Sequence, residues 1–64
     1  MSSDAKQYSK TVQLLQRAGF KIEPQTQVWE LRGPNGVLRG AFSVEVVMKN
    51  PTTIALALRS RGLV

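Results

Sequence analysis

Apolar residues recur with helical spacing between Asp4 and Ala18. At about 100° per residue, Tyr8, Val12 and Leu15 fall on one narrow stripe. This pattern predicts an amphipathic helix with one buried face. Ser3 is expected to cap its start, because a serine hydroxyl accepts a hydrogen bond from a free amide of the first turn.

Two short segments in which apolar and polar residues alternate follow the predicted helix. The first, Phe20–Glu23, has both of its apolar side chains on one side. The second, Gln27–Arg32, places Trp29 and Leu31 on one side. Strict alternation is typical of half-buried strands, so both segments are predicted as β-strands.

The tetrapeptide Gly33–Gly36 predicts a tight turn, since its proline presets the turn and its last glycine supplies a positive φ. Val37–Ser43 is expected to return as an antiparallel strand, with Leu38 and Phe42 on the face of the preceding apolar residues. Val44–Met48 is expected to stay extended, either as a continuation of this strand or as a short separate piece.

A second helix is predicted near the end of the chain. Asn50 is expected to cap it and Pro51 to occupy its first position, while Ile54, Ala57 and Leu58 form its buried stripe. Both predicted helices end at a glycine in the left-handed conformation, after which an apolar residue folds back. The two endings are Leu15-Gln-Arg-Ala-Gly-Phe20 and Leu58-Arg-Ser-Arg-Gly-Leu63.

The predicted order is α–β–β–β–α in a single domain over residues 1–64, with residues 1–3 frayed. A sheet with both helices on one face gives an α+β fold, a two-layer sandwich with a three-stranded antiparallel sheet. A chain this short buries only about 60% of its unfolded surface, so its core is small. The expected core residues are Tyr8, Val12, Leu15, Phe20, Ile22, Trp29, Leu31, Leu38, Phe42, Ile54 and Leu58.

The balance of charge is basic, with nine Lys and Arg against four Asp and Glu and a formal net charge of +5. Such a balance favours a polyanion as partner. Lys6, Lys10 and Arg17 fall within about 40° of one another, opposite to the apolar stripe of the first helix. This row is either a solvated helix face or a set of contacts to the phosphates of a nucleic-acid backbone.

Further basic residues lie around the hairpin and the last helix. Arg32 and Arg39 flank the hairpin and Lys49 precedes the last helix, and these three complete the predicted nucleic-acid-binding set. Arg59 and Arg61 also have a structural explanation, because cations in a last helical turn complement the helix dipole.

The residue types exclude several chemistries. Without cysteine or histidine, the chain has no thiolate or imidazole metal ligand and no histidine general base. Its carboxylates are spread one per segment, so neither a paired-carboxylate site nor a calcium cage is expected. We therefore expect no enzyme, no cofactor and no metal site. No apolar run approaches the roughly 18 residues of a membrane span, which predicts a cytoplasmic protein without membrane contact.

The element order and both helix endings resemble those of the HicA-type toxins, small proteins with a fold like the double-stranded-RNA-binding domain. The first ending reads Leu14-Leu15-Gln-Arg-Ala-Gly-Phe20 here. In that family a Gly-Ser-His stretch at the start of the second strand serves RNA cleavage, whereas the matching positions, Gln25–Val28, read Gln-Thr-Gln-Val. The resemblance implies a non-catalytic relative that keeps the scaffold and its basic surface, with RNA favoured over DNA as partner.

Several apolar residues are left outside the predicted core. They lie on the far sheet face, in the Val-rich segment and on the outer side of the last helix: Val28, Val37, Ala41, Val46 and Leu56. They predict a homodimer through the open sheet face or through a Val44–Met48 edge, or else a small protein partner. The alternative function is thus a protein-interaction module of a phage-like or toxin–antitoxin-like system.

Overall fold

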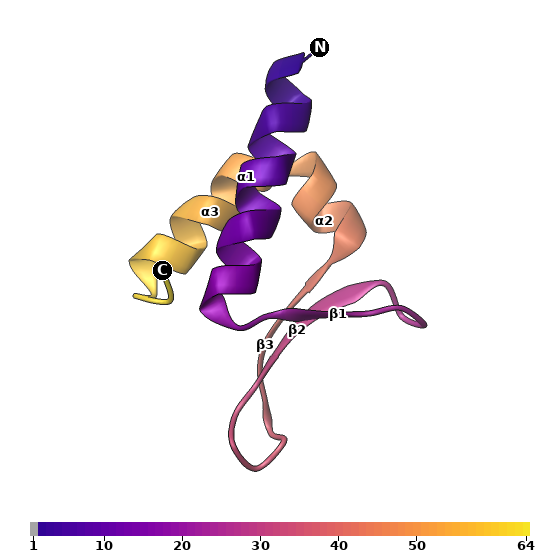
Figure 1. Cartoon of the computed structure of the whole chain (residues 1–64), viewed down its shortest axis with the longest axis vertical. Coiled ribbons are helices and arrows are strands. Elements are labelled where there is room, and N and C mark those ends of the chain that lie inside the picture. The colour runs from indigo at the N-terminus through magenta and orange to yellow at the C-terminus, as the bar shows by residue number, and fades with distance from the viewer. Residues whose placement is uncertain (1) are drawn as a thin grey trace.

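The computed structural model describes residues 2–64, with side chains from residue 5 onward. Its elements are α1 (Ser2–Ala18), β1 (Lys21–Glu23), β2 (Val28–Arg32), β3 (Leu38–Ser43), α2 (Val44–Lys49) and α3 (Pro51–Ser60). The three strands form one antiparallel sheet in the order β1-β2-β3, and the helices gather on one side of it (Figure 1). The predicted α+β fold with a three-stranded antiparallel sheet is confirmed.

The first helix begins earlier than predicted. Because α1 starts at Ser2, Ser3 lies inside the helix and is not its cap. Of the three residues expected to be frayed, Met1 lies outside the described residues and the next two belong to α1. The helix buries Leu15 and Thr11 completely or nearly so, and the Thr11 hydroxyl donates a hydrogen bond of 2.8 Å to the carbonyl of Pro51. This bond joins α1 to the start of α3.

Both predicted glycine endings are confirmed. At the end of α1, Gly19 has a φ of 99°, and the Phe20 amide donates to the Leu15 carbonyl at 2.9 Å. At the end of α3, Gly62 has a φ of 70°, and the next amide donates to the Leu58 carbonyl at 2.9 Å. Each helix therefore ends through contacts among neighbouring residues in the chain.

The sheet departs from the predicted pattern at a β-bulge. Leu31 pairs with Gly40, but Arg32 pairs with Leu38, so Arg39 is the extra residue on β3. A shift of one residue moves a side chain to the other face of a sheet. The prediction of Leu38 in the core is wrong for this reason, and this residue is 48% exposed.

Two further predictions need correction, one about a buried residue and one about secondary structure. Ile22 pairs with Trp29, as its parity requires, but it lies on the edge strand β1 and is 46% exposed. Val44–Met48 is not extended, because Val44–Lys49 forms the helix α2. The Ser43 hydroxyl accepts a hydrogen bond from the Val46 amide, which caps this helix.

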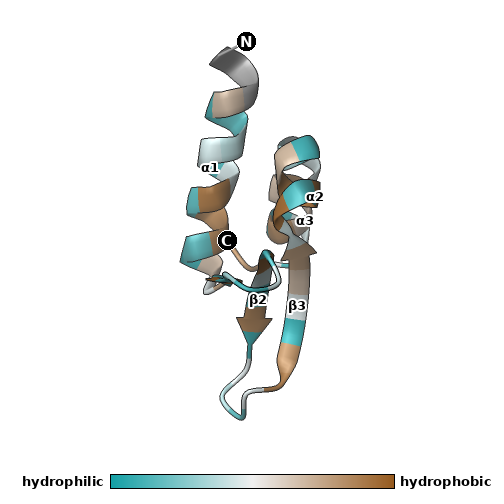
Figure 2. Ribbon diagram, turned by 90° about the vertical axis from the view of Figure 1, so that its right-hand side faces the viewer, coloured by the Kyte–Doolittle hydropathy of each residue, from teal (hydrophilic) through white to brown (hydrophobic). Residues whose placement is uncertain are grey.

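The core lies between the helices and the Trp29 face of the sheet. Its buried cluster consists of Leu15, Phe20, Trp29, Val47, Ile54 and Leu58. Predicted core members at its margin are half-buried against it, namely Tyr8, Val12, Leu31 and Phe42. Figure 2 shows apolar segments of the helices facing one another above the sheet.

The predicted start of the last helix is confirmed in one respect and wrong in another. Pro51 occupies the first turn of α3, which confirms its expected place. The side chain of Asn50 does not cap α3, and its Nδ2 instead donates to the Val46 carbonyl at 3.4 Å. This asparagine therefore holds the end of the preceding helix.

Candidate nucleic-acid interface

The row of basic residues predicted on the first helix is present on α1. Lys6, Lys10 and Arg17 are all exposed, and they lie on the side of the helix away from buried Thr11 and Leu15. With a rise of about 1.5 Å per residue, successive members are about 6 Å and about 10 Å apart along the helix axis. No acidic residue occurs between positions 5 and 22 of the chain. From position 5 onward, α1 therefore places no acidic side chain of its own among these cations.

A second group of basic residues lies at one end of the fold. In the antiparallel sheet, the start of β1, the end of β2 and the start of β3 lie at the same end. The C-terminal ends of α1 and α3 lie on that same side of the molecule (Figure 1). We call this group the basic end, and its members are Arg17, Lys21, Arg32, Arg39, Arg59 and Arg61.

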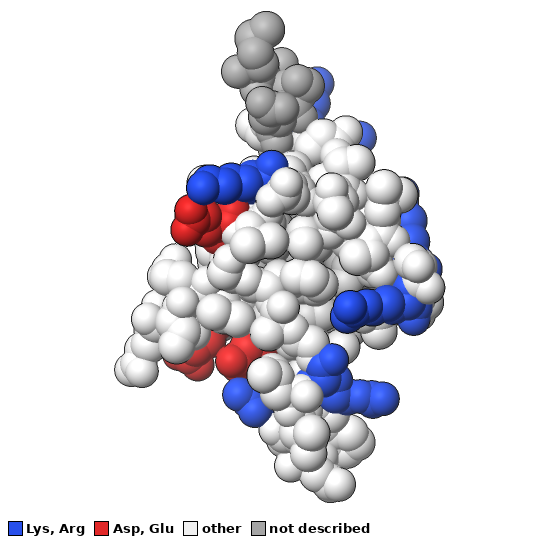
Figure 3. Space-filling view, turned by 180° about the vertical axis from the view of Figure 1, so that it is seen from behind, with Lys and Arg blue, Asp and Glu red and all other residues white. Residues whose placement is uncertain are grey.

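The acidic residues are distributed differently from the basic ones. Glu23 lies at the opposite end of β1, and Glu45 lies on α2, where it forms an ion pair of 2.8 Å with Lys49. Glu30 is the exception, because it lies on β2 beside the basic end and pairs with Arg32 at 3.2 Å. Figure 3 shows basic side chains along its right-hand side down to the region above the hairpin, while the acidic side chains lie to the left, each group of them beside a basic side chain. The positive charge is therefore concentrated and not spread evenly.

Arg32 is the member of the basic end that the chain itself holds most firmly. Its Nη1 donates to the Gly36 carbonyl at 2.9 Å, and its Nη2 lies 3.2 Å from Oε1 of Glu30. Both contacts fix the guanidinium beside the hairpin turn. Arg39 is exposed, and its stem lies against Gly33. The predicted pair around the hairpin is thus one cation that stiffens the turn and one that faces solvent.

The structure does not bring Lys49 together with the other predicted nucleic-acid-binding residues. Lys49 lies in the last turn of α2, beyond the end of β3 and away from the hairpin. The basic end instead contains three cations that the predicted binding set did not include, Lys21, Arg59 and Arg61. Their signal in the sequence is indirect, because the strand order is needed to place Lys21, and the packing of α3 is needed to place Arg59 and Arg61, at the same end as Arg32 and Arg39.

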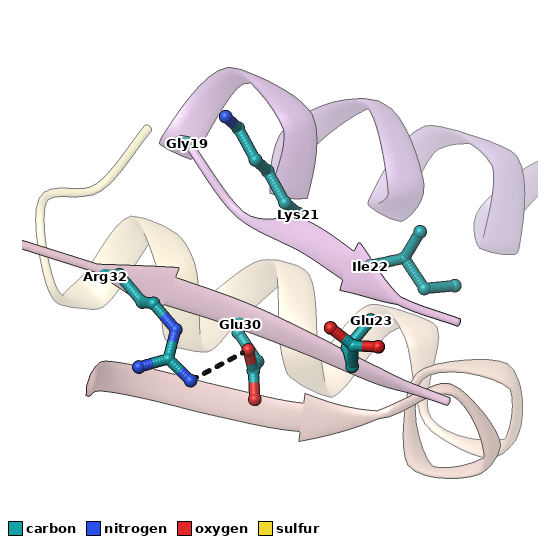
Figure 4. Close-up of a pocket in the computed structure, with 6 residues that line it drawn as sticks. All are labelled: Gly19, Lys21, Ile22, Glu23, Glu30 and Arg32. Atoms are coloured by element: carbon teal, nitrogen blue, oxygen red, sulfur yellow. Dashed lines mark hydrogen bonds and ion pairs between the residues drawn. The ribbon is translucent and has the colours of Figure 1, made fainter. Parts of the chain in front are cut away.

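A shallow hollow of about 390 Å³ lies beside the basic end, over β1 and β2. Its lining residues are Gly19, Lys21, Ile22, Glu23, Glu30 and Arg32. Figure 4 shows Arg32 and Glu30 turned toward each other, while Lys21 points away from them. Because two cations and two carboxylates line this open hollow, its charge favours neither an anionic nor a cationic ligand. Among the described residues, no three acidic side chains come close enough together to hold a metal ion.

The apolar residues predicted as an interface occupy three separate places. Val28 and Ala41 lie on the open sheet face, where Val28 is half-buried and Ala41 is exposed. Val37 lies at the hairpin and is 63% exposed, while Val46 and Leu56 are exposed on α2 and α3. The edge predicted for Val44–Met48 is wrong, since that segment is helical. Only the sheet face remains as the predicted route to a homodimer.

The positions that match the catalytic stretch of the HicA-type toxins lie in the β1–β2 connection. Residues 25–27 form its turn, and Val28 opens β2. Gln27 has a positive φ of 56° and its carbonyl accepts a hydrogen bond from the Val44 amide at 2.9 Å. This stretch connects two parts of the backbone, and the family resemblance itself stays a prediction.

Comparisons with known proteins found no match for this chain. Within the described residues, no helix is both long and apolar enough to span a membrane. No family model matches the chain, and no curated protein and no solved structure is similar to it.

Proposed function

We propose that this chain is a nucleic-acid-binding module that holds the phosphate backbone and carries out no catalysis. The observation that carries the proposal is the basic end, where side chains from five elements place cations at one end of the fold. Lys6 and Lys10 add two exposed cations on the same face of α1 as Arg17. Each phosphate contact by Lys or Arg releases counterions, which drives binding without reading sequence.

The aromatic residues support backbone binding over base stacking. Proteins that hold single strands by their bases offer exposed aromatic rings. Here Phe20 and Trp29 are buried, while Tyr8 and Phe42 are half-buried against the core. The chain has only these four aromatic residues. Its exposed binding groups are therefore the cations.

Absence of catalysis is part of the proposal and rests on side-chain chemistry. The chain has no histidine, and the positions of the family's cleavage stretch are Gln25–Val28. No group in that stretch transfers a proton near neutral pH. The proposal thus describes a non-catalytic relative of the HicA-type toxins that keeps the scaffold and binds RNA or DNA.

The proposal is tested by the salt dependence of binding to a labelled nucleic acid. The parent is expected to bind less tightly as salt rises, with a steep linear slope of log affinity against log salt. Replacing Lys6, Lys10 and Arg17 together by glutamine should lower this slope by about one unit for each phosphate that the variant no longer neutralises. Lys49→Gln is the matched control, because Lys49 is paired with Glu45 away from the basic end.

One result would contradict the whole proposal, and a second would remove the α1 row from it. A parent protein that shows no salt-dependent binding to RNA or DNA would remove it altogether. A triple variant that binds with the affinity and slope of the parent would show that the α1 row is only a solvated face. Circular dichroism of each variant must match that of the parent, so that weaker binding is not mistaken for unfolding.

A second candidate function is docking to a small protein partner. It is favoured by apolar residues on α2 and α3 that the core does not use, since Met48 is 59% and Leu56 is 58% exposed. Capture of partners with and without nuclease treatment separates the two functions. A protein that stays bound after nuclease treatment, and no longer binds the Leu56→Ser variant, would favour docking.

A further inference from the structure

The β2–β3 hairpin extends beyond the helices, and no other described element packs over its turn (Figures 1 and 2). Figures 1 and 2 both show its turn projecting away from the helical layer. Val37 is 63% exposed and Leu38 is 48% exposed, and Pro34 at the turn is exposed as well. Val37 and Leu38 are thus neighbouring apolar residues that do not belong to the core cluster.

The tip of this hairpin is built to keep its shape. The Gly33 amide donates to the Val37 carbonyl at 2.8 Å, and the Gly36 amide donates to the Gly33 carbonyl at 3.0 Å. Gly36 has a φ of 78°, and its carbonyl accepts the 2.9 Å hydrogen bond from Arg32. The bulge at Arg39 then places Leu38 across from Arg32 and off the core face. The exposed apolar pair is therefore held in a defined position.

Charge surrounds the base of the hairpin. Arg32 lies across from Leu38 and Arg39 follows Leu38 in β3, so the two arginines flank the apolar pair. Arg32 is paired with Glu30, and Arg39 is exposed to solvent. The other members of the basic end lie behind them, and Figure 3 shows basic side chains above the hairpin. An apolar tip with a positive base matches a partner whose apolar surface lies between two rows of phosphates.

We infer that the hairpin enters the major groove of double-stranded DNA, with Val37 and Leu38 against base edges and the basic end on the flanking phosphates. The major groove of B-form DNA is about 12 Å wide and admits a two-stranded β-ribbon, and thymine methyl groups there accept apolar contacts. The major groove of an RNA duplex is too deep and narrow for side chains to read. This inference rests on the proposed function and adds the form of the ligand.

The inference separates two kinds of contact by their response to salt. Contacts to phosphates contribute to the salt slope, whereas apolar contacts change affinity and leave the slope unchanged. Val37→Ser with Leu38→Ser should therefore weaken binding to a DNA duplex about tenfold with an unchanged slope. Arg39→Gln should lower the slope by about one unit. The double variant keeps the core intact, because both side chains are largely exposed.

The experiment titrates the full-length protein with a labelled DNA duplex and with an RNA duplex of the same sequence at several salt concentrations. Met48→Ser with Leu56→Ser is the matched control, since those side chains are equally exposed but lie on the helices. Trp29 fluorescence confirms that every variant is folded. Of the two double serine variants, only the hairpin variant is expected to bind more weakly, and only to the DNA duplex.

Three outcomes would overturn the inference while leaving the proposed function standing. The first is a hairpin variant that binds the DNA duplex as the parent does. The second is equally weakened binding to the RNA duplex, and the third is a parent that binds RNA but not DNA. A parent that binds neither duplex in a salt-dependent manner would remove the proposed function as well.

Discussion

Thr11→Val is expected to destabilise the fold, because it removes the hydrogen bond that joins the first and last helices. Thr11 is 1% exposed, and its hydroxyl donates to the Pro51 carbonyl at 2.8 Å across 40 positions of the chain. Valine has the same shape but donates no hydrogen bond. A typical intramolecular hydrogen bond contributes about 1 kcal/mol to the free energy of unfolding.

That change is large for a domain of this size. At roughly 0.05–0.15 kcal/mol per residue, the whole chain has a free energy of unfolding of about 3–10 kcal/mol. A change of about 1 kcal/mol lowers the Tm of a small domain by about 4–8 °C. Urea unfolding followed by the fluorescence of Trp29, the one tryptophan of the chain, measures the change directly.

Thr53→Val is the matched control for this experiment. Thr53 is exposed on α3, and threonine and valine have similar helix propensities, so the control should stay within about 0.5 kcal/mol of the parent. The reasoning would be refuted if Thr11→Val were as stable as the control. It would also fail if the Thr11 variant were more stable than the parent.

Three further predictions concern the β1–β2 turn, catalysis and self-association. Gln27→Gly should raise the free energy of unfolding by about 0.5–1 kcal/mol, because Gln27 has a φ of 56° that glycine adopts without strain; a lower Tm would contradict this. The protein should not cleave labelled RNA at neutral pH, and cleavage that co-elutes with it and disappears in a point variant would show otherwise. In sedimentation equilibrium at micromolar concentration, the parent should exceed 7.1 kDa and Val28→Thr should shift it toward the monomer. A single monomeric species for both proteins would end the homodimer hypothesis.

The features predicted correctly from the sequence are those fixed by near neighbours. The glycine endings at Gly19 and Gly62 need only a left-handed residue and a following apolar side chain, and both were visible in the sequence. The hairpin turn that ends at Gly36 is equally local. Local rules therefore predicted where most elements stop.

The errors arose where two distant segments decide the outcome. Leu38 has the right parity for the core, but the bulge that removes it exists only in the pairing of β2 with β3. The valines of 44–48 favour a strand by propensity, yet the Ser43 cap and the Glu45–Lys49 pair support a helix that buries Val47. Here the local signals conflict, because the cap and the ion pair favour a helix while the valines favour a strand, and the helix is the form that buries Val47.

The candidate site shows the same limit. Lys6, Lys10 and Arg17 share a helix face that simple geometry reveals, and the structure keeps them exposed there. Arg59 and Arg61 looked like ordinary companions of a helix C-terminus. Their place beside the hairpin end depends on where α3 packs, which no local pattern states. Predicting a site whose residues come from five elements requires knowing how those elements are arranged in space.

The packing of α1 against α3 also determines when the core of this chain can close. Among the helix pairs of the described residues, these two pack together most extensively, and Leu15 of α1 belongs to the same buried cluster as Ile54 and Leu58 of α3. The ribosome makes α1 first and α3 last, whereas the sheet joins strands that are neighbours in the chain. During synthesis, the part of the apolar side of α1 that packs on α3 therefore stays uncovered until α3 has been made. Closing the core therefore requires two helices that are distant in the chain to dock, whereas the sheet needs only neighbouring strands to pair.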